Sequence, residues 1–223
     1  MNASEVIERL KAMGDPERAR ISQGFFKTGP GQYGEGDVFV GLTVPQVRAL
    51  SKELRALPLG ETVKLLHSPL HESRLLALLL LIQAYGKGDE AERGRVYGLY
   101  LQNTRWINNW DLVDVSAEHI VGAHLKERDR RVLDALAGSK LLWERRISIL
   151  ATFHFIRRGE FADTLRIAER LLSDREDLIH KAVGWLLREV GKRDLAAEEA
   201  FLKIHSRVMP RTTLRYAIER FPE

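Results

Sequence analysis

Cysteine is absent from this chain of 223 residues. Its absence excludes a disulfide framework, a thiol nucleophile and any metal site built on thiolate ligands. Long hydrophobic segments are missing too. The longest uninterrupted apolar run, residues 75–82, has eight residues, whereas a helix needs roughly 20 to span a bilayer. We therefore expect no membrane among the partners of this protein.

The N-terminal segment MNASEVIERLKAMGDPERAR carries charges of both signs and lacks the apolar centre of a signal peptide. We expect an amphipathic helix there and a cytoplasmic location. Apolar residues make up 44% of the chain and charged residues 30%, which is the composition of a folded globular protein and not of a disordered one.

The net charge of +4 is too small to indicate nucleic-acid binding by itself, so the distribution of charge matters more. Basic residues gather in two regions: Lys203, Arg207, Arg211, Arg215 and Arg220 near the C-terminus, and Arg145, Arg146, Arg157 and Arg158 in the middle. Each group could be a solvated helix face. Two such groups on one small chain favour a polyanionic partner.

Apolar residues recur with the 3.6-residue period almost throughout, and alternation typical of strands is nearly absent. The pattern predicts helices over 42–57, 68–86, 142–159, 175–191 and 195–208. Thr43 is the expected N-cap of the first, with Pro45 in its first turn. The second is apolar nearly all round, which indicates burial between neighbouring helices. The fold class is predicted to be all-α.

The chain also resembles itself at intervals. Segments 67–88, 138–159 and 172–194 each have a serine near the start and a polar lead-in with a basic residue. A long apolar run follows in each of them. A period of about 35–40 residues made of helix pairs is typical of HEAT-like or armadillo-type α-solenoids. We predict about six helix pairs in a single domain, residues 1–223, with equivalent positions lining a concave basic surface.

The most distinctive segment is RWINNWDLVDVSAEHIVGAHL, residues 105–125. Asn108 or Asn109 is a natural N-cap, so a helix should begin near Trp110. Trp110 and Asp114 would then share one face near the positive end of that helix, while Asp111 is explained as an acid in the first turn. The alternative is a partly buried tryptophan beside a capped or salt-bridged aspartate.

Later segments supply further candidates at the repeat spacing. Arg146 follows Trp110 by 36 residues, and Trp185 follows Arg146 by 39. Lys181, Trp185 and Arg188 occupy positions i, i+4 and i+7, one face of one helix. Two tryptophans, a carboxylate and several cations are thus predicted on one concave wall, although Trp185 could instead be packed between repeats.

These motifs resemble the AlkD-like DNA alkylation-repair glycosylases, which are built from HEAT-like repeats. The matching pieces are WDLVD (110–114), W-x-R-R-x-x-I (143–149) and KAVGWLLRE (181–189), with a weaker match in VGLTVPQVRAL (40–50). The resemblance covers most of the chain from residue 39 onward. It implies removal of cationic alkylpurines such as 3-methyladenine and 7-methylguanine from duplex DNA, without extrusion of the damaged base.

The resemblance also implies roles for individual residues. Asp114 corresponds to the catalytic carboxylate, and Trp110, Trp185 and Arg146 complete the lesion-facing site. Aromatic faces attract the positively charged base, and a carboxylate beside the sugar stabilises the developing oxocarbenium charge and can position water. Arg146 would hold a phosphate, and the outer basic residues Arg145, Lys181 and Arg188 would add salt-dependent affinity for DNA.

No metal and no cofactor are expected. His67 and His71 are four residues apart, but Pro69 between them disfavours a helical ligand pair, so both are expected at the surface or in loops. The glycine-rich stretch TGPGQYGEGD, residues 28–37, is expected to be a flexible surface loop, with contact to a ligand as the alternative. A monomer would suffice to clamp DNA.

The sequence is also compatible with two other functions. One is a non-catalytic DNA-binding solenoid selective for damaged or branched DNA, for which the basic clusters would suffice. The other is a scaffold for protein interactions, since HEAT-like stacks often bind peptides. Release of an alkylated base would separate the glycosylase from both.

Overall fold

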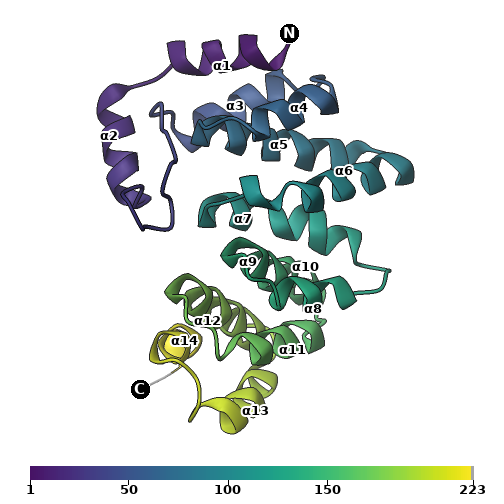
Figure 1. The fold of residues 1–223 in the computed structure, drawn as a ribbon. Helices are drawn as coiled ribbons and strands as arrows, with labels where there is room; N and C mark the ends of the chain where they lie inside the picture. The colour runs from purple at the N-terminus through teal and green to yellow at the C-terminus, as the bar shows by residue number, and fades with distance from the viewer. Residues whose placement is uncertain (222–223) are drawn as a thin grey trace. The chain divides into compact units, whose positions relative to one another are not determined.

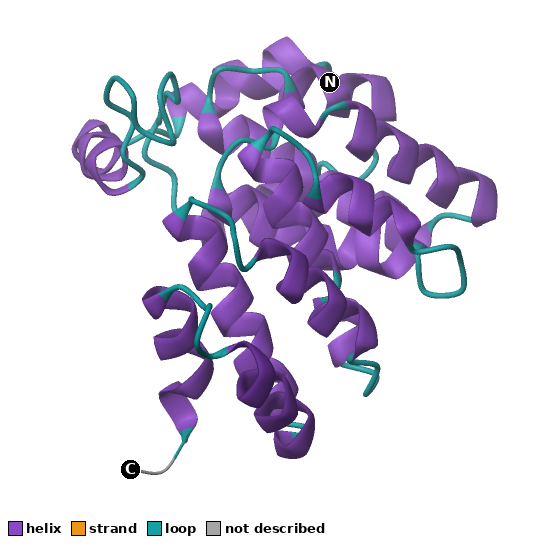
Figure 2. Cartoon of the chain, turned by 60° about the horizontal axis from the view of Figure 1, so that its bottom comes forward, coloured by secondary structure: helices purple, strands orange, loops and turns teal. Residues whose placement is uncertain are grey.

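The structure, a computed structural model, describes residues 1–221. Helices joined by loops and turns account for the fold in Figure 2. The described residues contain no strand, only one isolated parallel bridge between Val38 and Leu70. The predicted all-α class is therefore confirmed. Over the same residues, no helix has both the length and the apolar character needed to cross a membrane.

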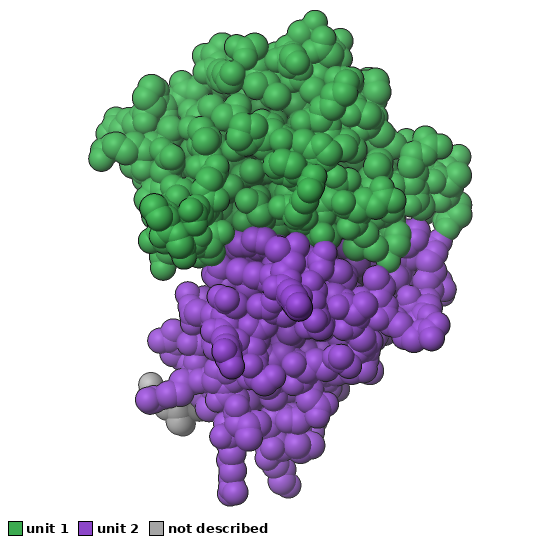
Figure 3. Space-filling model, in the orientation of Figure 1, with its two compact units in different colours: residues 1–116 green, residues 117–223 purple. Residues whose placement is uncertain are grey.

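The chain divides into two compact units, Met1–Ser116 and Ala117–Glu223, which Figure 3 shows in different colours. The organisation of residues 1–223 as a single domain stays a prediction.

Unit 1 is a stack of helices around α5 (Figure 1). Its helices are α1 (Ala3–Ala12), α2 (Pro16–Phe25), α3 (Val44–Glu53), α4 (Leu59–Leu66), α5 (His71–Lys87), α6 (Glu90–Gln102), the 3-10 turn η1 (Thr104–Trp106) and α7 (Trp110–Ala117), whose last residue belongs to unit 2. Helices α3, α4 and α6 all pack against α5. This arrangement buries α5 nearly all round, as its apolar sequence predicted.

The helix starts of unit 1 follow from capping residues. Thr43 caps α3 in a capping box with Gln46, and Pro45 lies in the first turn, both as predicted. The single N-terminal helix predicted for the first twenty residues is wrong. Asp15 accepts hydrogen bonds from the backbone N–H groups of Glu17 and Arg18, and Pro16 opens a new helix, so α1 and α2 are separate.

Unit 2 is organised around α12, which packs against α9, α11, α13 and α14. Its elements are the π-helical turn η2 (Glu118–Gly122), α8 (Arg131–Ala137), α9 (Leu142–Ala151), α10 (Phe153–Ile156), α11 (Ala162–Leu171), α12 (Asp177–Gly191), α13 (Leu195–His205), α14 (Arg211–Ala217) and the 3-10 turn η3 (Ile218–Arg220). The helix predicted over 142–159 is divided into α9 and α10 at Thr152, whose hydroxyl bonds the Ile149 carbonyl 2.7 Å away.

Packed helix pairs recur within each unit, α4 on α5 in unit 1 and α8 on α9 in unit 2 among them. This is the building principle expected of HEAT-like repeats. The concave basic surface stays a prediction.

A glycine controls how closely α12 and α14 approach. A Cβ atom added at Gly184 would lie 2.4 Å from the Thr213 carbonyl oxygen and 2.6 Å from Cβ of Tyr216. We expect Gly184→Ala to lower the free energy of unfolding by about 1–3 kcal/mol, because the two backbones would be forced apart. Urea denaturation measures the change.

Gly98 in α6 provides the matched control, since a Cβ there would meet nothing within 4 Å. Gly98→Ala should raise the free energy of unfolding by up to about 1 kcal/mol, because alanine is the better helix former. Equal effects of the two substitutions would contradict the close packing of α12 on α14.

Candidate active site at the start of helix α7

Helix α7 begins at Trp110, as predicted, and presents Trp110 and Asp114 one turn apart. Both side chains are half-buried. The backbone N–H of Trp110 donates to Oδ1 of Asn109 at 2.9 Å. An asparagine side chain therefore accepts a hydrogen bond from the first backbone N–H of the helix. Asp114 lies near the buried Tyr100, whose pKa is raised by burial and, to a smaller extent, by the negative charge of Asp114.

The residues before α7 are held by a buried carboxylate from a distant loop. Asp37, whose side chain is 1% exposed, is the last residue of the glycine-rich stretch 28–37. Its Oδ1 accepts a hydrogen bond from Asn108 at 3.1 Å, and its Oδ2 accepts one from Asn109 at 3.2 Å. Nη2 of Arg74, on α5, donates to Oδ1 at 2.5 Å. Asp37 therefore fastens the start of α7 to α5.

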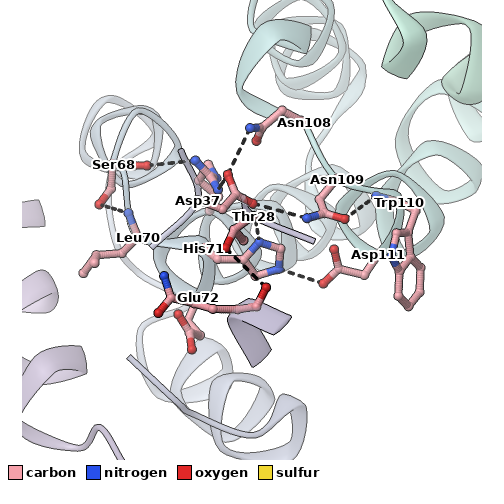
Figure 4. A network of polar contacts seen from close by, with 12 residues as sticks. Thr28, Asp37, Ser68, Leu70, His71, Glu72, Asn108, Asn109, Trp110 and Asp111 are labelled. Atoms are coloured by element: carbon pink, nitrogen blue, oxygen red, sulfur yellow. Dashed lines mark hydrogen bonds and ion pairs between the residues drawn. The ribbon is translucent and has the colours of Figure 1, made fainter. Parts of the chain in front are cut away.

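His71 makes a second connection between the same elements (Figure 4). It is the first residue of α5. Its Nδ1 lies 3.1 Å from Oδ2 of Asp37, and its Nε2 lies 2.8 Å from Oδ2 of Asp111 in the first turn of α7. The carboxylates of Asp37 and Asp111 thus lie on opposite sides of one imidazole ring, which is 3% exposed.

The network sets the charge of its members. Burial by itself lowers the pKa of His71, but the hydrogen bonds to Asp111 and Asp37 outweigh burial and raise that pKa to about 9. Burial raises the pKa of Asp37, but the hydrogen bond from His71 and the positive charge of Arg74 outweigh it, so the net pKa is lowered. At neutral pH the site is an imidazolium between carboxylates.

Glu72, next to His71, fastens the segment that carries Asp37. Its buried carboxylate accepts hydrogen bonds from the backbone N–H groups of Val40, Gly41 and Leu42 at 2.8–3.2 Å. The carbonyl of Val38 in turn accepts from the N–H of His71 at 2.8 Å. The loop end is therefore fixed to the first turn of α5, which keeps Asp37 in place.

Aromatic rings connect His71 to Trp110 by a second route. Phe26 stacks on Trp110 with ring centroids 5.4 Å apart and on Phe39 with centroids 5.1 Å apart. Phe39 stacks on His71 at 4.5 Å. Phe25, 63% exposed, forms an edge-to-face pair with Trp110, with ring centroids 6.1 Å apart. One face of the Trp110 indole is thus supported from inside the protein.

Comparisons with known proteins show the family of the chain. A sequence model of the DNA alkylation repair enzymes matches residues 6–221. The chain belongs to the DNA alkylation repair enzyme family. A solved structure of a predicted DNA alkylation repair enzyme from Enterococcus faecalis superposes with a TM-score of 0.72 over 94% of this chain and 97% of that one, at 19% identity, a likeness of fold. A search of curated proteins gives no significant match.

Two further residues predicted for this repair-family site lie on α9 in unit 2. Arg146 is buried, and its Nη1 donates to the Leu178 carbonyl at 2.5 Å. Arg145 bonds Asp174 through Nε at 2.6 Å and two backbone carbonyls through Nη1. Both guanidinium groups thus brace α9 against neighbouring segments. Their contact with DNA stays a prediction, and it would add to or replace these bonds.

The other three predicted residues share one face of α12, as their spacing required. Trp185 is half-buried and its ring lies 5.7 Å from that of Phe153. Lys181 pairs with Asp177 at 2.7 Å, and Arg188 pairs with Glu219. The roles of these residues toward DNA stay predictions for the repair enzyme.

One expectation about unit 1 is wrong, and the explanation of Asp111 is incomplete. His71 is not a surface or loop histidine: it is buried at the start of α5 and bridges two carboxylates, whereas His67 is exposed as expected. Asp111 does lie in the first turn of α7, but the helix dipole is not its only reason, since it binds His71. The glycine-rich loop also ends in a buried residue, Asp37.

Sequence reasoning missed Asp37 and Phe26 altogether. Asp37 lies 34 residues from His71 and 72 from Asn109, and no spacing rule connects them. One signal did exist. A helix buried all round cannot hold His71, Glu72 and Arg74 without partners, because buried charges must be paired. That rule predicts acidic or backbone partners without naming them.

The raised pKa of His71 predicts how stability depends on pH. A group whose pKa is higher in the folded state stabilises fully below its unfolded pKa of 6.5 and ceases to do so as the pH rises through about 9. Between pH 7 and pH 9.5, the free energy of unfolding should fall by on the order of 2 kcal/mol because of His71. Urea denaturation of wild type and His71→Gln at both pH values isolates this contribution. Equal pH dependence in the two proteins would contradict it.

Proposed function

We propose that this protein is a DNA glycosylase that hydrolyses the N-glycosidic bond of N3- or N7-alkylated purines in duplex DNA. The observation that carries the proposal is the pairing on α7: Trp110 and the carboxylate of Asp114 lie one turn apart at the start of the helix. Hydrogen bonds between His71 and Asp111 and from Asn109 to Asp37 hold that helix start in place. Membership of the DNA alkylation repair family supports DNA as the substrate.

The chemistry needs an anion beside the sugar and a surface for a cation. Alkylation at N3 or N7 gives the purine a positive charge, and an aromatic face such as that of Trp110 attracts it by about 0.5–2 kcal/mol. When the glycosidic bond breaks, the bonding electrons leave with the purine, which becomes neutral. The positive charge then moves to the deoxyribose, where Asp114 stabilises it.

Water completes the reaction. Its oxygen adds to C1′ of the sugar, and the proton it loses passes to the carboxylate of Asp114 and then to solvent. The support that Phe26 gives to Trp110 suits a fixed aromatic surface that a base contacts while it remains in the duplex. We therefore propose cleavage without base flipping, in contrast to most enzymes that act on bases.

Unit 2 would contribute the remaining groups. We propose that Trp185 presents a second aromatic surface to the lesion and that Arg146 contacts a phosphate. Arg145, Lys181 and Arg188 would add affinity that falls as the salt concentration rises. None of these roles requires a metal or an organic cofactor.

Release of free base tests the proposal directly. The wild-type protein is incubated with methylated and with unmethylated duplex DNA, and the ethanol-soluble fraction is analysed by mass spectrometry. Release of 3-methyladenine or 7-methylguanine above the protein-free rate supports a glycosylase. Binding of DNA without release at any pH from 6 to 9 would overturn the proposal and favour the alternative, a non-catalytic protein selective for damaged or branched DNA.

A further inference from the structure

The hydrogen bonds of His71 require a proton on both ring nitrogens when Asp37 and Asp111 are ionised. Nδ1 faces Oδ2 of Asp37 at 3.1 Å, and Nε2 faces Oδ2 of Asp111 at 2.8 Å. An ionised carboxylate can only accept hydrogen bonds, so two such contacts on one ring require an imidazolium. The remaining charged group in the network, Arg74, is on the same helix as His71 and bonds the other oxygen of Asp37.

The residues on either side of Trp110 are connected to His71 by hydrogen bonds, directly or through Asp37. Asn108 and Asn109 bind Asp37 immediately before Trp110, and Asp111 binds His71 immediately after it. Within residues 1–221, the other carboxylate oxygen of Asp111 is buried without a hydrogen-bond partner. His71 is therefore the group that holds the Asp111 side chain.

A series of stacked aromatic rings also connects the His71 ring to Trp110. His71 stacks on Phe39, Phe39 on Phe26, and Phe26 on Trp110. Stacking on Phe26 thus fixes one face of the Trp110 ring. The hydrogen bonds of its chain neighbours, Asn109 to Asp37 and Asp111 to His71, fix its backbone. Small losses of such positioning have large effects on rate, because reacting groups must be held in a narrow range of geometry.

We propose that Asp37 and His71 form a positioning pair that holds the first turn of α7, and with it Trp110 and Asp114, in the arrangement used for base release. The catalytic consequence rests on the proposed function, whereas the effect on Trp110 does not. When His71 loses a proton, one of its nitrogens presents a lone pair to a carboxylate, and one of the two bonds is lost. The pair then no longer fixes α7.

The first experiment measures base release from methylated duplex DNA between pH 6.5 and pH 9.8, corrected for protein-free release at each pH. Circular dichroism confirms that the protein stays folded. We expect the wild-type rate to fall about tenfold with a midpoint near 9, the pKa of His71. His71→Gln should be at least about tenfold slower at pH 7.5 and independent of pH over this range, with DNA affinity within about threefold of wild type.

His67→Gln is the matched control. His67 is a histidine four residues away that is exposed and bonds Asn103, outside the network. It should keep the wild-type rate and the wild-type pH profile. The proposal is overturned if His71→Gln releases base as fast as His67→Gln, or if folded wild type shows no decline near pH 9. The wild-type profile needs no variant, so misfolding of His71→Gln would leave the test intact.

The second experiment needs no activity. In ¹H–¹⁵N NMR spectra the indole N–H signal of Trp110, assigned by its loss in Trp110→Phe, should shift with a midpoint near pH 9 in wild type and His67→Gln. It should not shift in His71→Gln. An indole titration without any base release would overturn the proposed function and support the positioning pair. Base release without an indole titration would overturn the pair and leave the proposed function standing.

Discussion

Replacing Asp114 by asparagine is expected to slow the release of alkylated purines at least about a hundredfold, while affinity for duplex DNA changes less than about threefold. The amide has nearly the same shape as the carboxylate but no negative charge. It can neither stabilise the positive charge that develops on the sugar nor accept a proton from water. Single-turnover release of 3-methyladenine, followed by mass spectrometry, measures the rate.

A change in charge alone could alter DNA binding, so the control must remove one negative charge elsewhere. Glu127→Gln does so at a side chain that is 77% exposed and pairs with its neighbour Lys126. We expect it to release base at the wild-type rate. Equal rates for Asp114→Asn and wild type, with both folded by circular dichroism, would remove Asp114 from the reaction.

Replacing Asp37 by asparagine is expected to lower the free energy of unfolding by about 3–5 kcal/mol at pH 7. Asp37 is the acceptor for His71, Arg74 and two asparagines, and its side chain is 1% exposed. Without its charge, two buried cations lose a shared partner, and water cannot replace it. Urea denaturation followed by circular dichroism gives the free energy of unfolding.

The matched control is Asp129→Asn. Asp129 also pairs with an arginine, Arg131, but its side chain is 55% exposed and that of Arg131 is 89% exposed. Water screens such a pair, so the expected loss is much smaller than that for Asp37→Asn. If the two substitutions cost the same, the buried network does not stabilise unit 1 in the way its geometry indicates.

Local sequence signals predicted the parts of the site that lie within one helix. The asparagines before Trp110 place the start of α7, and the four-residue step from Trp110 to Asp114 places both on one face. The same reasoning fixed the shared face of Lys181, Trp185 and Arg188 on α12. These predictions succeeded because helix period and capping depend on residues within one or two turns.

The number of basic residues in a segment does not predict how many of them are available to bind a polyanion. Arg145 belongs to the predicted surface for a polyanion, and its guanidinium also bonds Asp174, which is 29 residues away in the sequence. Arg188 pairs with Glu219. The number of arginines in a segment does not reveal which of them have acidic partners inside the protein, because those partners come from other helices.

The sequence by itself determined that this protein is all-α and that Trp110 and Asp114 share a helix face, because both depend on short-range periodicity. Only the tertiary structure decided that His71 is a buried imidazolium between Asp37 and Asp111, partners 34 and 40 residues away. A histidine's charge depends on what surrounds it. Here those surroundings are assembled from a loop and two helices that meet only when unit 1 folds.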